Sequence, residues 1–251
     1  MFLQYICSGG YNRWVSHPPL FNMNGCINEE ELNLFHTPAR IIVAGFSGSG
    51  KTNLVTKIVT KYHDTFEKII ICGVPRHPLQ MRSNLAHKVV VRNNIINPLG
   101  EDDNNDDDDD NPPPPTTKQT LFILDDIFID AVQSKYVVDA FTKGRHSNLS
   151  TILITQNLFF SGKYARNISL NATHYLLLRQ RDLNQIECLG RQIYGNKRSK
   201  DFLDIYKAAV KKQPYGYLLV DLSIKSHESH QFRTNIVGEP PFEVVFQWRK
   251  E

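Results

Sequence analysis

The chain has 251 residues, of which 41% are hydrophobic and 22% are charged. This balance provides enough apolar side chains for a buried core and excludes a largely disordered chain. The longest apolar runs fall far below the roughly 18 residues that a membrane-spanning helix needs, and no basic segment precedes the apolar N-terminus. Four widely spaced cysteines form no CxxC pair, which argues against a zinc site or a disulfide framework. We therefore expect an intracellular protein that is neither secreted nor membrane-embedded.

The formal charge of +3 conceals an uneven distribution of charge along the chain. Eight of the 26 acidic residues lie between Glu101 and Asp110, in a tract without a basic residue. Outside residues 101–111, the 29 basic residues face 18 acidic ones, which leaves a charge of +11 on the other 240 residues. A basic body of this kind favours a polyanionic partner.

From Arg40 onward, short apolar strands alternate with amphipathic helices. The predicted strands are Arg40–Ala44, Lys68–Gly73, Lys88–Arg92, Thr120–Leu124, Thr151–Thr155, His174–Leu178 and Tyr217–Asp221. The predicted helices are Thr52–Tyr62, Ile129–Thr142 and Leu183–Ile193, and we assign their apolar stripes to the core. This alternation predicts an α/β fold with a mostly parallel sheet flanked by helices.

Two segments fall outside this alternation. Residues 1–39 are rich in Gly, Pro and Asn, and we predict that they form an N-terminal extension of one domain, residues 40–251. Residues 101–119 combine the acidic tract with four prolines, so like-charge repulsion and missing backbone donors predict a disordered insert between two strands. A tolerated surface loop is the simpler interpretation of this insert. An acidic arm that mimics DNA and competes for the basic body is the alternative.

The strongest motif is a phosphate-binding loop of the Walker A type, G-x4-G-K-[ST]. It comprises Gly45, Phe46, Ser47, Gly48, Ser49, Gly50, Lys51 and Thr52. The motif follows a predicted strand and opens a predicted helix, as a phosphate loop requires. Its glycines let backbone N–H groups converge on a phosphate at the helix N-terminus. We expect Lys51 to reach the β- and γ-phosphates of ATP, and the Thr52 hydroxyl to bind Mg²⁺.

Two acids follow the predicted strand Thr120–Leu124, in the manner of a Walker B motif. We expect Asp125 to hold Mg²⁺ and Asp126 to polarise the attacking water. A helix N-cap is the alternative role for Asp125. Many ATPases of this general class carry Glu at the second position, and the Asp side chain reaches about one methylene less.

The strand Thr151–Thr155 ends in polar amides. In an ATPase with an additional strand between the two phosphate-site strands, Gln156 would face the γ-phosphate and orient water. An amide that caps the next turn is the alternative. The order of the three motifs favours the ATPase interpretation and predicts a P-loop NTPase of the additional-strand type.

Several segments in the second half of the chain resemble one family. They are GRHSNLSTILITQN (144–157), RNISLNATHYLLL (166–178), RQRDLNQI (179–186), LGRQIY (189–194), PYGYLLVDL (214–222) and FRTNI (232–236). From about His36 to Ile236, the chain resembles the DNA-packaging ATPases of the FtsK/HerA superfamily, in the branch found in poxvirus-like large DNA viruses and Polinton/adintovirus-type elements. The resemblance implies a homo-oligomeric ring that hydrolyses ATP to drive double-stranded DNA into a preformed capsid, with a capsid or portal protein as a further partner.

The resemblance also implies roles for individual residues. It matches Lys51 and Thr52 to the phosphate-binding pair, Asp125 and Asp126 to the metal and water acids, and Gln156 to the sensor. Arg145 matches an arginine that reaches the ATP of a neighbouring subunit, where a guanidinium can stabilise the transferring phosphoryl group. Arg166 is a second candidate. For both arginines, a surface position without a catalytic role is the alternative.

Contact with DNA is expected to be independent of sequence, because no helix-turn-helix, zinc-finger or RNP motif occurs. Basic residues cluster on and around two predicted helices and would neutralise DNA phosphates. They are Arg191, Lys197, Arg198, Lys200, Lys207, Lys211 and Lys212. An ordinary solvated helix face is the alternative interpretation.

Two other functional classes share some of these features. A nucleoside or nucleotide kinase has a phosphate loop and a similar size, but it usually carries an arginine-rich lid and lacks the acid-ended strand followed by a Gln-ended one. A non-hydrolysing DNA-binding assembly subunit is the second alternative. The chain retains every motif residue, which favours an active ATP-driven translocase. A GTPase is excluded because no N-K-x-D motif occurs.

Overall fold

The structure is a computed structural model of the whole chain. It describes residues 3–7, 33–73, 76–99, 118–159, 161–211, 214–224, 226, 228–237 and 242–246. Most of the predicted N-terminal extension and residues 101–117 of the predicted insert lie outside these ranges. The predictions of an extension and of a disordered insert therefore stay predictions for those residues.

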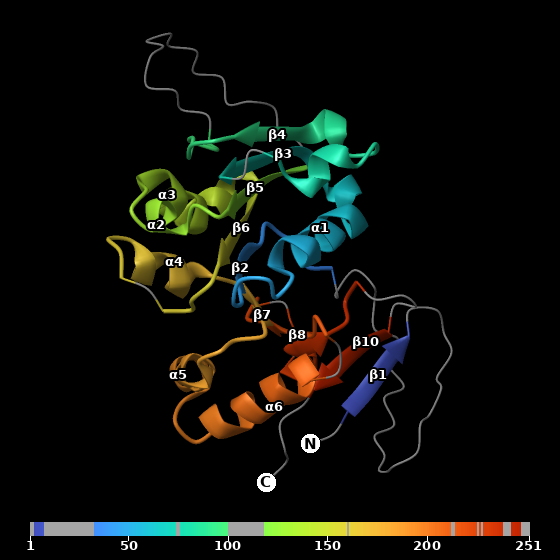
Figure 1. Cartoon of the computed structure of the whole chain (residues 1–251), viewed down its shortest axis with the longest axis vertical. Helices are drawn as coiled ribbons and strands as arrows, with labels where there is room; N and C mark the ends of the chain where they lie inside the picture. The colour runs from blue at the N-terminus through green and yellow to red at the C-terminus, as the bar shows by residue number, and fades with distance from the viewer. Residues whose placement is uncertain are drawn as a thin grey trace.

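Ten strands of the described residues form one mixed sheet with helices on both faces (Figure 1). The strand order is β1-β10-β9-β8-β7-β2-β6-β5-β3-β4. Strands β4, β3, β5, β6, β2 and β7 are parallel, and β8, β9, β10 and β1 continue the sheet in antiparallel pairing. The bounds are β1 Leu3–Cys7, β2 Arg40–Ala44, β3 Phe66–Gly73, β4 Val89–Arg92, β5 Gln119–Asp125, β6 Leu149–Thr155, β7 His174–Leu178, β8 Tyr217–Asp221, β9 Phe232–Thr234 and β10 Phe242–Phe246.

Strand β6 lies between β2 and β5, the strands that precede the phosphate loop and carry the paired acids. Its pairing with both neighbours is parallel, and Ala44 at the end of β2 lies opposite Thr155 at the end of β6. The three strands therefore end at one edge of the sheet. This order confirms the additional-strand P-loop NTPase fold and the mostly parallel sheet flanked by helices.

The predicted strands agree closely with the observed ones. Strands β2, β7 and β8 have the predicted bounds, and the other predicted strands differ by one or two residues at an end. The prediction missed β1, β9 and β10. Strand β9 has only three residues with a buried arginine at its centre, so it lacks the apolar pattern that reveals the other strands.

The α-helices of the described ranges are α1 Lys51–Lys61, α2 Phe128–Ala131, α3 Lys135–Thr142, α4 Ala165–Asn171, α5 Leu183–Tyr194 and α6 Ser199–Lys211. Short 3₁₀ helices are η1 His63–Thr65, η2 Pro78–Met81, η3 Ala86–Lys88, η4 Gly144–Ser147 and η5 Glu228–His230. In this part of the chain, no helix has both the length and the hydropathy of a membrane span.

The predicted helix Ile129–Thr142 is wrong as a continuous element, because the structure divides it into α2 and α3. The carbonyl of Val132 accepts a hydrogen bond from the backbone N–H of Tyr164 at 3.0 Å. Ser134 then adopts extended backbone angles before α3 begins. The hydrogen bond from Tyr164, just before α4, to Val132, just after α2, therefore takes the place of a hydrogen bond within a continuous helix.

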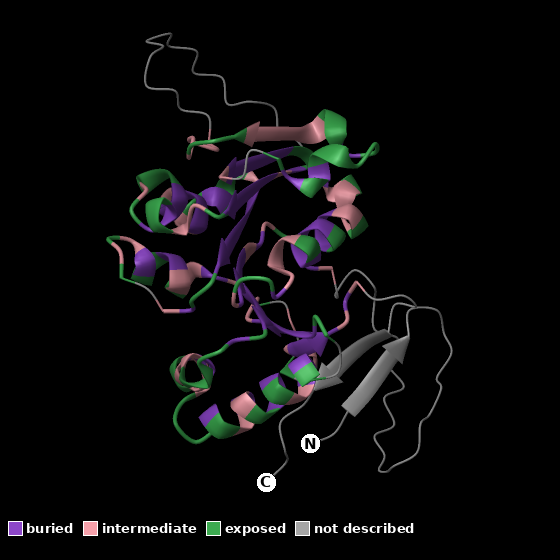
Figure 2. Ribbon diagram, in the orientation of Figure 1, coloured by how far each residue is buried: buried purple, intermediate pink, exposed green. Residues whose placement is uncertain are grey.

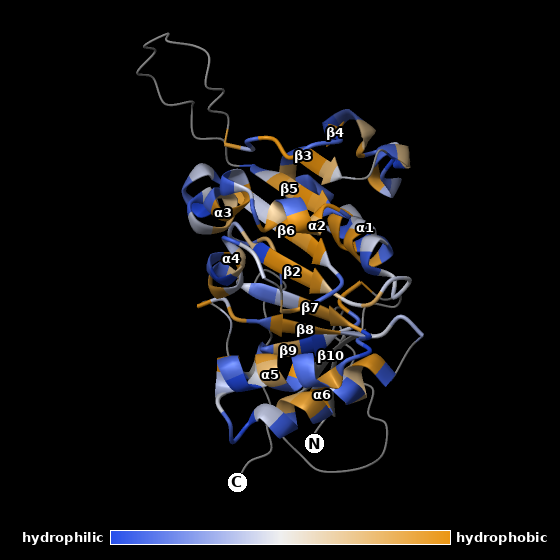
Figure 3. Ribbon diagram, turned by 60° about the vertical axis from the view of Figure 1, so that its left-hand side comes forward, coloured by the Kyte–Doolittle hydropathy of each residue, from blue (hydrophilic) through white to orange (hydrophobic). Residues whose placement is uncertain are grey.

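The two faces of the sheet bury two separate groups of apolar side chains (Figures 2 and 3). On one face, alternate residues such as Ile41 and Val43 of β2 pack in the same cluster as Val55 of α1. On the other face, Ile42 and Ala44 belong to the cluster that contains residues of α3, α5 and α6. The period of two along β2 thus supplies both cores, as expected for a strand that is covered on both sides.

The described residues just before β2 pack into the core. Phe35 and Ala39 are each 1% exposed. The Gln119 side-chain amide donates to the carbonyl of Phe35 at 2.7 Å, and its Oε1 accepts from the Ser150 hydroxyl at 2.5 Å. The predicted insert reached residue 119, but Gln119 is a buried residue of β5. This position is a correction to the predicted boundary.

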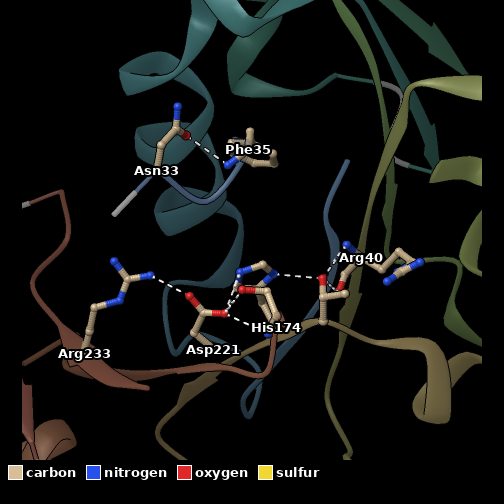
Figure 4. Close-up of polar contacts among 8 residues, drawn as sticks. Asn33, Phe35, Arg40, His174, Asp221 and Arg233 are labelled. Carbon is tan, nitrogen blue, oxygen red and sulfur yellow. Dashed lines mark hydrogen bonds and ion pairs between the residues drawn. The ribbon is translucent and has the colours of Figure 1, made fainter. Parts of the chain in front are cut away.

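A buried ionic network lies at the amino edge of the sheet, where the parallel strands begin (Figure 4). His174 begins β7, and Asp221 ends the antiparallel neighbour β8. The Asp221 carboxylate lies 3.2 Å from His174 Nε2 and 3.1 Å from the guanidinium of Arg233. Burial disfavours ionisation of Asp221, but hydrogen bonds and charge from His174 and Arg233 outweigh it and hold the pKa of Asp221 well below its usual range.

Replacing Arg233 with Met removes a partner of Asp221 while keeping a long apolar side chain. Because the carboxylate then stays buried with less compensation, we expect the free energy of unfolding at pH 7 to fall by about 3 kcal/mol. Urea denaturation followed by circular dichroism measures the change.

The matched control is Arg82→Met, at an exposed arginine, with an expected change of less than about 0.5 kcal/mol. Because the pKa of Asp221 is lower in the folded state, its contribution is complete above an unfolded-state pKa of about 4 and is lost as the pH falls below it. The difference between wild type and Arg233→Met should therefore shrink in acid. A difference that stays constant from pH 7 to pH 2 contradicts this assignment.

Candidate nucleotide-binding site

The phosphate loop connects β2 to α1 at the carboxyl edge of the sheet, where the parallel strands end. Gly48 and Gly50 have φ angles of 80° and 93°, in the left-handed region that favours glycine. Gly50 is the N-cap of α1, and its carbonyl accepts a hydrogen bond from the N–H of Leu54 at 2.9 Å. The first turn of α1 therefore presents its N–H groups to the loop, where an anion is stabilised.

The ammonium of Lys51 is folded over this loop. It donates to the carbonyls of Gly45 at 2.8 Å and of Phe46 at 3.1 Å. Burial lowers the pKa of Lys51, and the negative charges of Asp125 and Asp126 oppose this shift. The ammonium thus contacts the phosphate loop and is influenced by the charges of Asp125, at the end of β5, and of Asp126, which follows it.

A hydrogen bond joins the start of α1 to the end of β5. The Thr52 hydroxyl donates to Asp125 Oδ2 at 2.8 Å. Asp125 is buried, and burial is the main cause of its raised pKa, with the Thr52 hydrogen bond acting in the opposite direction. A cation that binds beside this carboxylate would offset the cost of its burial.

The Thr52 hydroxyl and the Asp125 carboxylate suit Mg²⁺, which needs few protein ligands, better than a metal ion that is coordinated by protein side chains alone. Within the described residues, no group of three or more His, Cys, Asp or Glu side chains could hold a metal ion. A hydroxyl and a carboxylate in contact, next to a phosphate loop, match the usual Mg²⁺ site, in which one or two protein ligands are completed by phosphate oxygens and water. Thr52 and Asp125 are the residues that would hold the ion.

Asp126 lies beside this pair and points away from the core. Its side chain is exposed, and its φ of 61° is uncommon for a residue other than glycine. This left-handed angle ends β5 and turns the chain toward α2. Of the two acids, the structure therefore buries Asp125 against α1 and leaves Asp126 accessible to solvent.

Gln156 follows β6 and is exposed at the same carboxyl edge. The N–H of Gly45, the first residue of the phosphate loop, donates to the carbonyl of Thr155 at 3.2 Å. This bond ties the start of the loop to the residue before Gln156. The structure thus brings the phosphate loop, Asp125, Asp126 and Gln156 to one edge.

The structure does not place Arg145 at this edge. Arg145 belongs to η4, before β6 begins, and its guanidinium Nε hydrogen bonds with His146 Nε2 at 3.1 Å. The seven residues of β6 separate it from the carboxyl edge, a length of about 23 Å at roughly 3.3 Å per residue. Arg145 therefore cannot reach the phosphate loop of its own chain. Arg166 is exposed in the first turn of α4.

Three features of the site were missed from sequence. Tyr215 is 63% exposed, and its ring lies 3.0 Å from where a Cβ on Gly50 would be. The guanidinium of Arg181 lies 5.4 Å from the centroid of the Phe46 ring. Gly73 ends β3 with a φ of 118°, directly beside Asp125. A glycine that ends an apolar strand was a usable signal, whereas the contacts of Tyr215 and Arg181 depend on the fold.

A comparison with protein families identifies the chain. The family model described as "Poxvirus A32 protein" matches residues 104–239, more than half of the chain. The chain belongs to the poxvirus A32 protein family. The match contains both acids and Gln156 but begins after the phosphate loop, so it is independent of the Walker A motif. The predicted resemblance to the poxvirus-like branch of packaging ATPases is confirmed.

Solved structures match this A32-family chain at low sequence identity. The genome packaging NTPase B204 from Sulfolobus turreted icosahedral virus 2, in complex with AMPPCP, matches with a TM-score of 0.50 and 14% identity over 84% of this chain and 98% of B204. The same protein in complex with AMP gives a TM-score of 0.46 and 16% identity over 75% of this chain and 94% of B204. No curated protein matches this sequence. The AMPPCP complex shows that the two proteins share a fold.

Gly73 provides a test of the backbone beside Asp125 in this A32-family site. A Cβ at Gly73 would lie 1.8 Å from the Asp125 carbonyl oxygen. We expect Gly73→Ala to lower the free energy of unfolding by about 3 kcal/mol, because strain at a positive φ adds to a clash with backbone. Urea denaturation measures the change.

Gly195→Ala is the matched control. Gly195 also has a positive φ, 80°, but a Cβ there meets nothing within 4 Å. Its replacement should cost only the strain, about 1 kcal/mol. Equal losses for the two variants would show that the approach of Gly73 to Asp125 is unimportant.

Proposed function

We propose that this A32-family chain is a Mg²⁺-dependent ATPase that couples ATP hydrolysis to the movement of double-stranded DNA during viral genome packaging. One observation carries the proposal. The hydrogen bond from Thr52 to Asp125 joins the phosphate loop to the acid-ended strand, with the Gln-ended strand β6 between them. This arrangement has a place for the phosphates, the metal and the attacking water of a hydrolysing site.

Nucleotide binding uses groups that already lie at the loop. The N–H groups at the start of α1 bind phosphate oxygens, and the Lys51 ammonium exchanges the carbonyls of Gly45 and Phe46 for the β- and γ-phosphates. B204, which shares the fold, was solved with AMPPCP, an analogue of ATP. ATP is therefore the nucleotide that we assign to this chain.

When bound by Thr52 and Asp125, Mg²⁺ would neutralise charge on the β- and γ-phosphates. The exposed side chains at the ends of β5 and β6 act on the water. Asp126 accepts a proton from the water while the oxygen of this water attacks the γ-phosphorus. The bond between the γ-phosphorus and the bridging oxygen breaks, and ADP leaves. Gln156 orients that water from the neighbouring strand. ADP and inorganic phosphate are the products.

The position of Arg145 supports a role in a neighbouring subunit. It lies at the amino edge of its own sheet and is exposed there. A neighbour that packs its carboxyl edge against this surface receives a guanidinium beside its ATP, which stabilises the charge of the transition state. This arrangement requires a homo-oligomer, and a ring satisfies it for every subunit.

The exposed faces of α5 and α6 are the DNA surface that we propose. These two helices pack on each other at the end of the sheet formed by β7, β8 and β9 (Figure 1). The exposed basic residues of these helices and of the segment between them are Arg191, Lys197, Arg198, Lys200, Lys207 and Lys211, and Lys212 lies outside the described residues. Contacts of this kind bind phosphate without reading bases and weaken steeply with salt.

The central prediction is an ATPase activity that long, non-specific double-stranded DNA stimulates. We expect Lys51→Ala and Asp125→Ala to lower the turnover number at least about 100-fold, because they remove phosphate and metal contacts at the reacting centre. Release of inorganic phosphate, measured with and without DNA, tests this expectation.

Lys57→Ala and Asp130→Ala are the matched controls, since both side chains are exposed and lie on α1 and α2 away from the loop. Both controls should retain wild-type turnover. Hydrolysis that is indifferent to DNA, or transfer of the γ-phosphate to a nucleoside, contradicts the translocase. Absence of hydrolysis in the wild type, with DNA binding retained, indicates a non-hydrolysing assembly subunit.

A subunit-mixing experiment tests Arg145. Arg145→Ala subunits keep an intact phosphate loop, and Lys51→Ala subunits keep the arginine. If Arg145 acts on a neighbouring subunit, mixing two inactive variants restores part of the DNA-stimulated hydrolysis, because some interfaces then pair an intact loop with an intact arginine.

The control mixture combines Lys51→Ala with Asp125→Ala, which both damage the same edge of the subunit. Its residual rate should stay at background, since no interface gains a complete site on either chain. If the mixture of Arg145→Ala and Lys51→Ala subunits shows no hydrolysis at any ratio, while light scattering shows that the subunits still assemble, Arg145 does not act on a neighbouring subunit.

A further inference from the structure

His77 is a buried polar side chain near Asp125, at the carboxyl edge of the sheet, and no step of the proposed function uses it. It lies between the end of β3 and η2, and it is 1% exposed. Its Nε2 lies 3.8 Å from Asp125 Oδ2 and has no hydrogen-bond partner within the part of the chain that the structure describes. A polar atom that is buried in this way and faces a functional carboxylate calls for an explanation.

The hydrogen bonds around His77 fix which ring nitrogen carries the hydrogen. Nδ1 accepts a hydrogen bond from the backbone N–H of Leu79 at 3.3 Å, and the backbone N–H of His77 donates to the Gln80 side chain at 3.0 Å. With Nδ1 as an acceptor, the neutral ring carries its hydrogen on Nε2. A ring nitrogen that accepts a hydrogen bond carries no proton, so the ring is neutral in this arrangement. His77 therefore directs a neutral N–H at Asp125.

The distance between His77 and Asp125 is slightly longer than a hydrogen bond. The terminal torsion of an aspartate side chain is soft, so a small rotation of the carboxylate closes the gap. The oxygen that faces His77 is also the one that accepts from Thr52. The imidazole and the hydroxyl together can therefore define the orientation of this carboxylate.

A neutral donor is well suited to this position. A Lys or Arg side chain beside Asp125 would also hold the carboxylate, but its positive charge would repel a divalent cation bound to the same group. An imidazole N–H orients the oxygen without that repulsion. Groups that orient a metal ligand in this manner commonly affect metal affinity strongly although they do not touch the metal.

We propose that His77 is a positioning residue that donates its Nε2–H to Asp125 and orients this carboxylate for Mg²⁺. The inference rests on the proposed function, because it assumes that Asp125 helps to hold the ion. Nothing in the sequence around residue 77 indicates this role. It follows from the burial of His77, the N-cap of η2, beside Asp125.

The experiment measures the Mg²⁺ requirement of nucleotide binding in the full chain. A fluorescent ADP analogue is titrated in EDTA, and MgCl₂ is then titrated at fixed nucleotide. His77→Leu removes the donor and keeps an apolar side chain of similar size, whereas His77→Gln restores a neutral N–H donor. His87→Leu, at an exposed histidine, is the matched control.

We expect His77→Leu to raise the half-saturating Mg²⁺ concentration about 10-fold and to leave the affinity in EDTA unchanged. His77→Gln should recover most of the wild-type requirement, and His87→Leu should match the wild type. Equal losses of affinity with and without Mg²⁺ in His77→Leu would show a purely structural role and overturn the inference. An unchanged Mg²⁺ requirement in His77→Leu also overturns it.

A measurement on the wild type keeps the test independent of how the variants fold. The Nε2–H signal of His77, observed by ¹⁵N-edited NMR of the ADP complex, should move downfield when MgCl₂ is added, because its hydrogen bond to Asp125 shortens. A signal that does not move contradicts the inference. If the wild type binds nucleotide but shows no Mg²⁺ requirement, the metal assignment of the proposed function fails as well. If the wild type requires Mg²⁺ and only the His77 variants behave contrary to expectation, the role of His77 alone fails.

Discussion

Parallel, in-register pairing of three strands is the constraint on which the site depends. Strands β2, β6 and β5 all end at the carboxyl edge, so the phosphate loop, Gln156 and the two acids leave the sheet side by side. Residues more than a hundred positions apart meet there because strand order, rather than sequence proximity, sets their distance. Two apolar layers, one on each face of the sheet, hold those strands in place. The hydrogen bond from Thr52 to Asp125 then joins the start of α1 to the end of β5.

Much of this arrangement could be predicted from sequence, because each motif of the candidate site directly follows a strand. A run of buried apolar residues marks the strand, and the abrupt change to Gly, Asp or Gln marks its carboxyl end. For Asp125 and Gln156 the pattern therefore gave both the residue and its edge of the sheet. The bounds of β2, β7 and β8 followed from the same contrast. The division between α2 and α3 did not, since it depends on a distant backbone contact at Val132.

The features that could not be predicted depend on contacts that produce no periodic pattern in the sequence. His77 lies outside the strands and α-helices that the sequence pattern predicts, and its importance comes from its burial beside Asp125. Strand β9 buries an arginine in an apolar sheet, where Asp221 from the neighbouring strand neutralises its charge. Arg145 could be matched to a family position, but its place at the amino edge required the strand order.

The described residues on either side of the acidic tract show where this tract joins the sheet. The described residues that flank it, Leu99 and Lys118, adjoin β4 and β5, toward one end of the sheet. The basic faces of α5 and α6 lie toward the opposite end, beyond β7 (Figure 1). The attachment points of the acidic tract and the basic residues of α5 and α6 therefore lie toward opposite ends of the described sheet. In the proposed function, DNA that approaches the α5–α6 flank therefore meets basic side chains without passing the attachment points of the acidic tract.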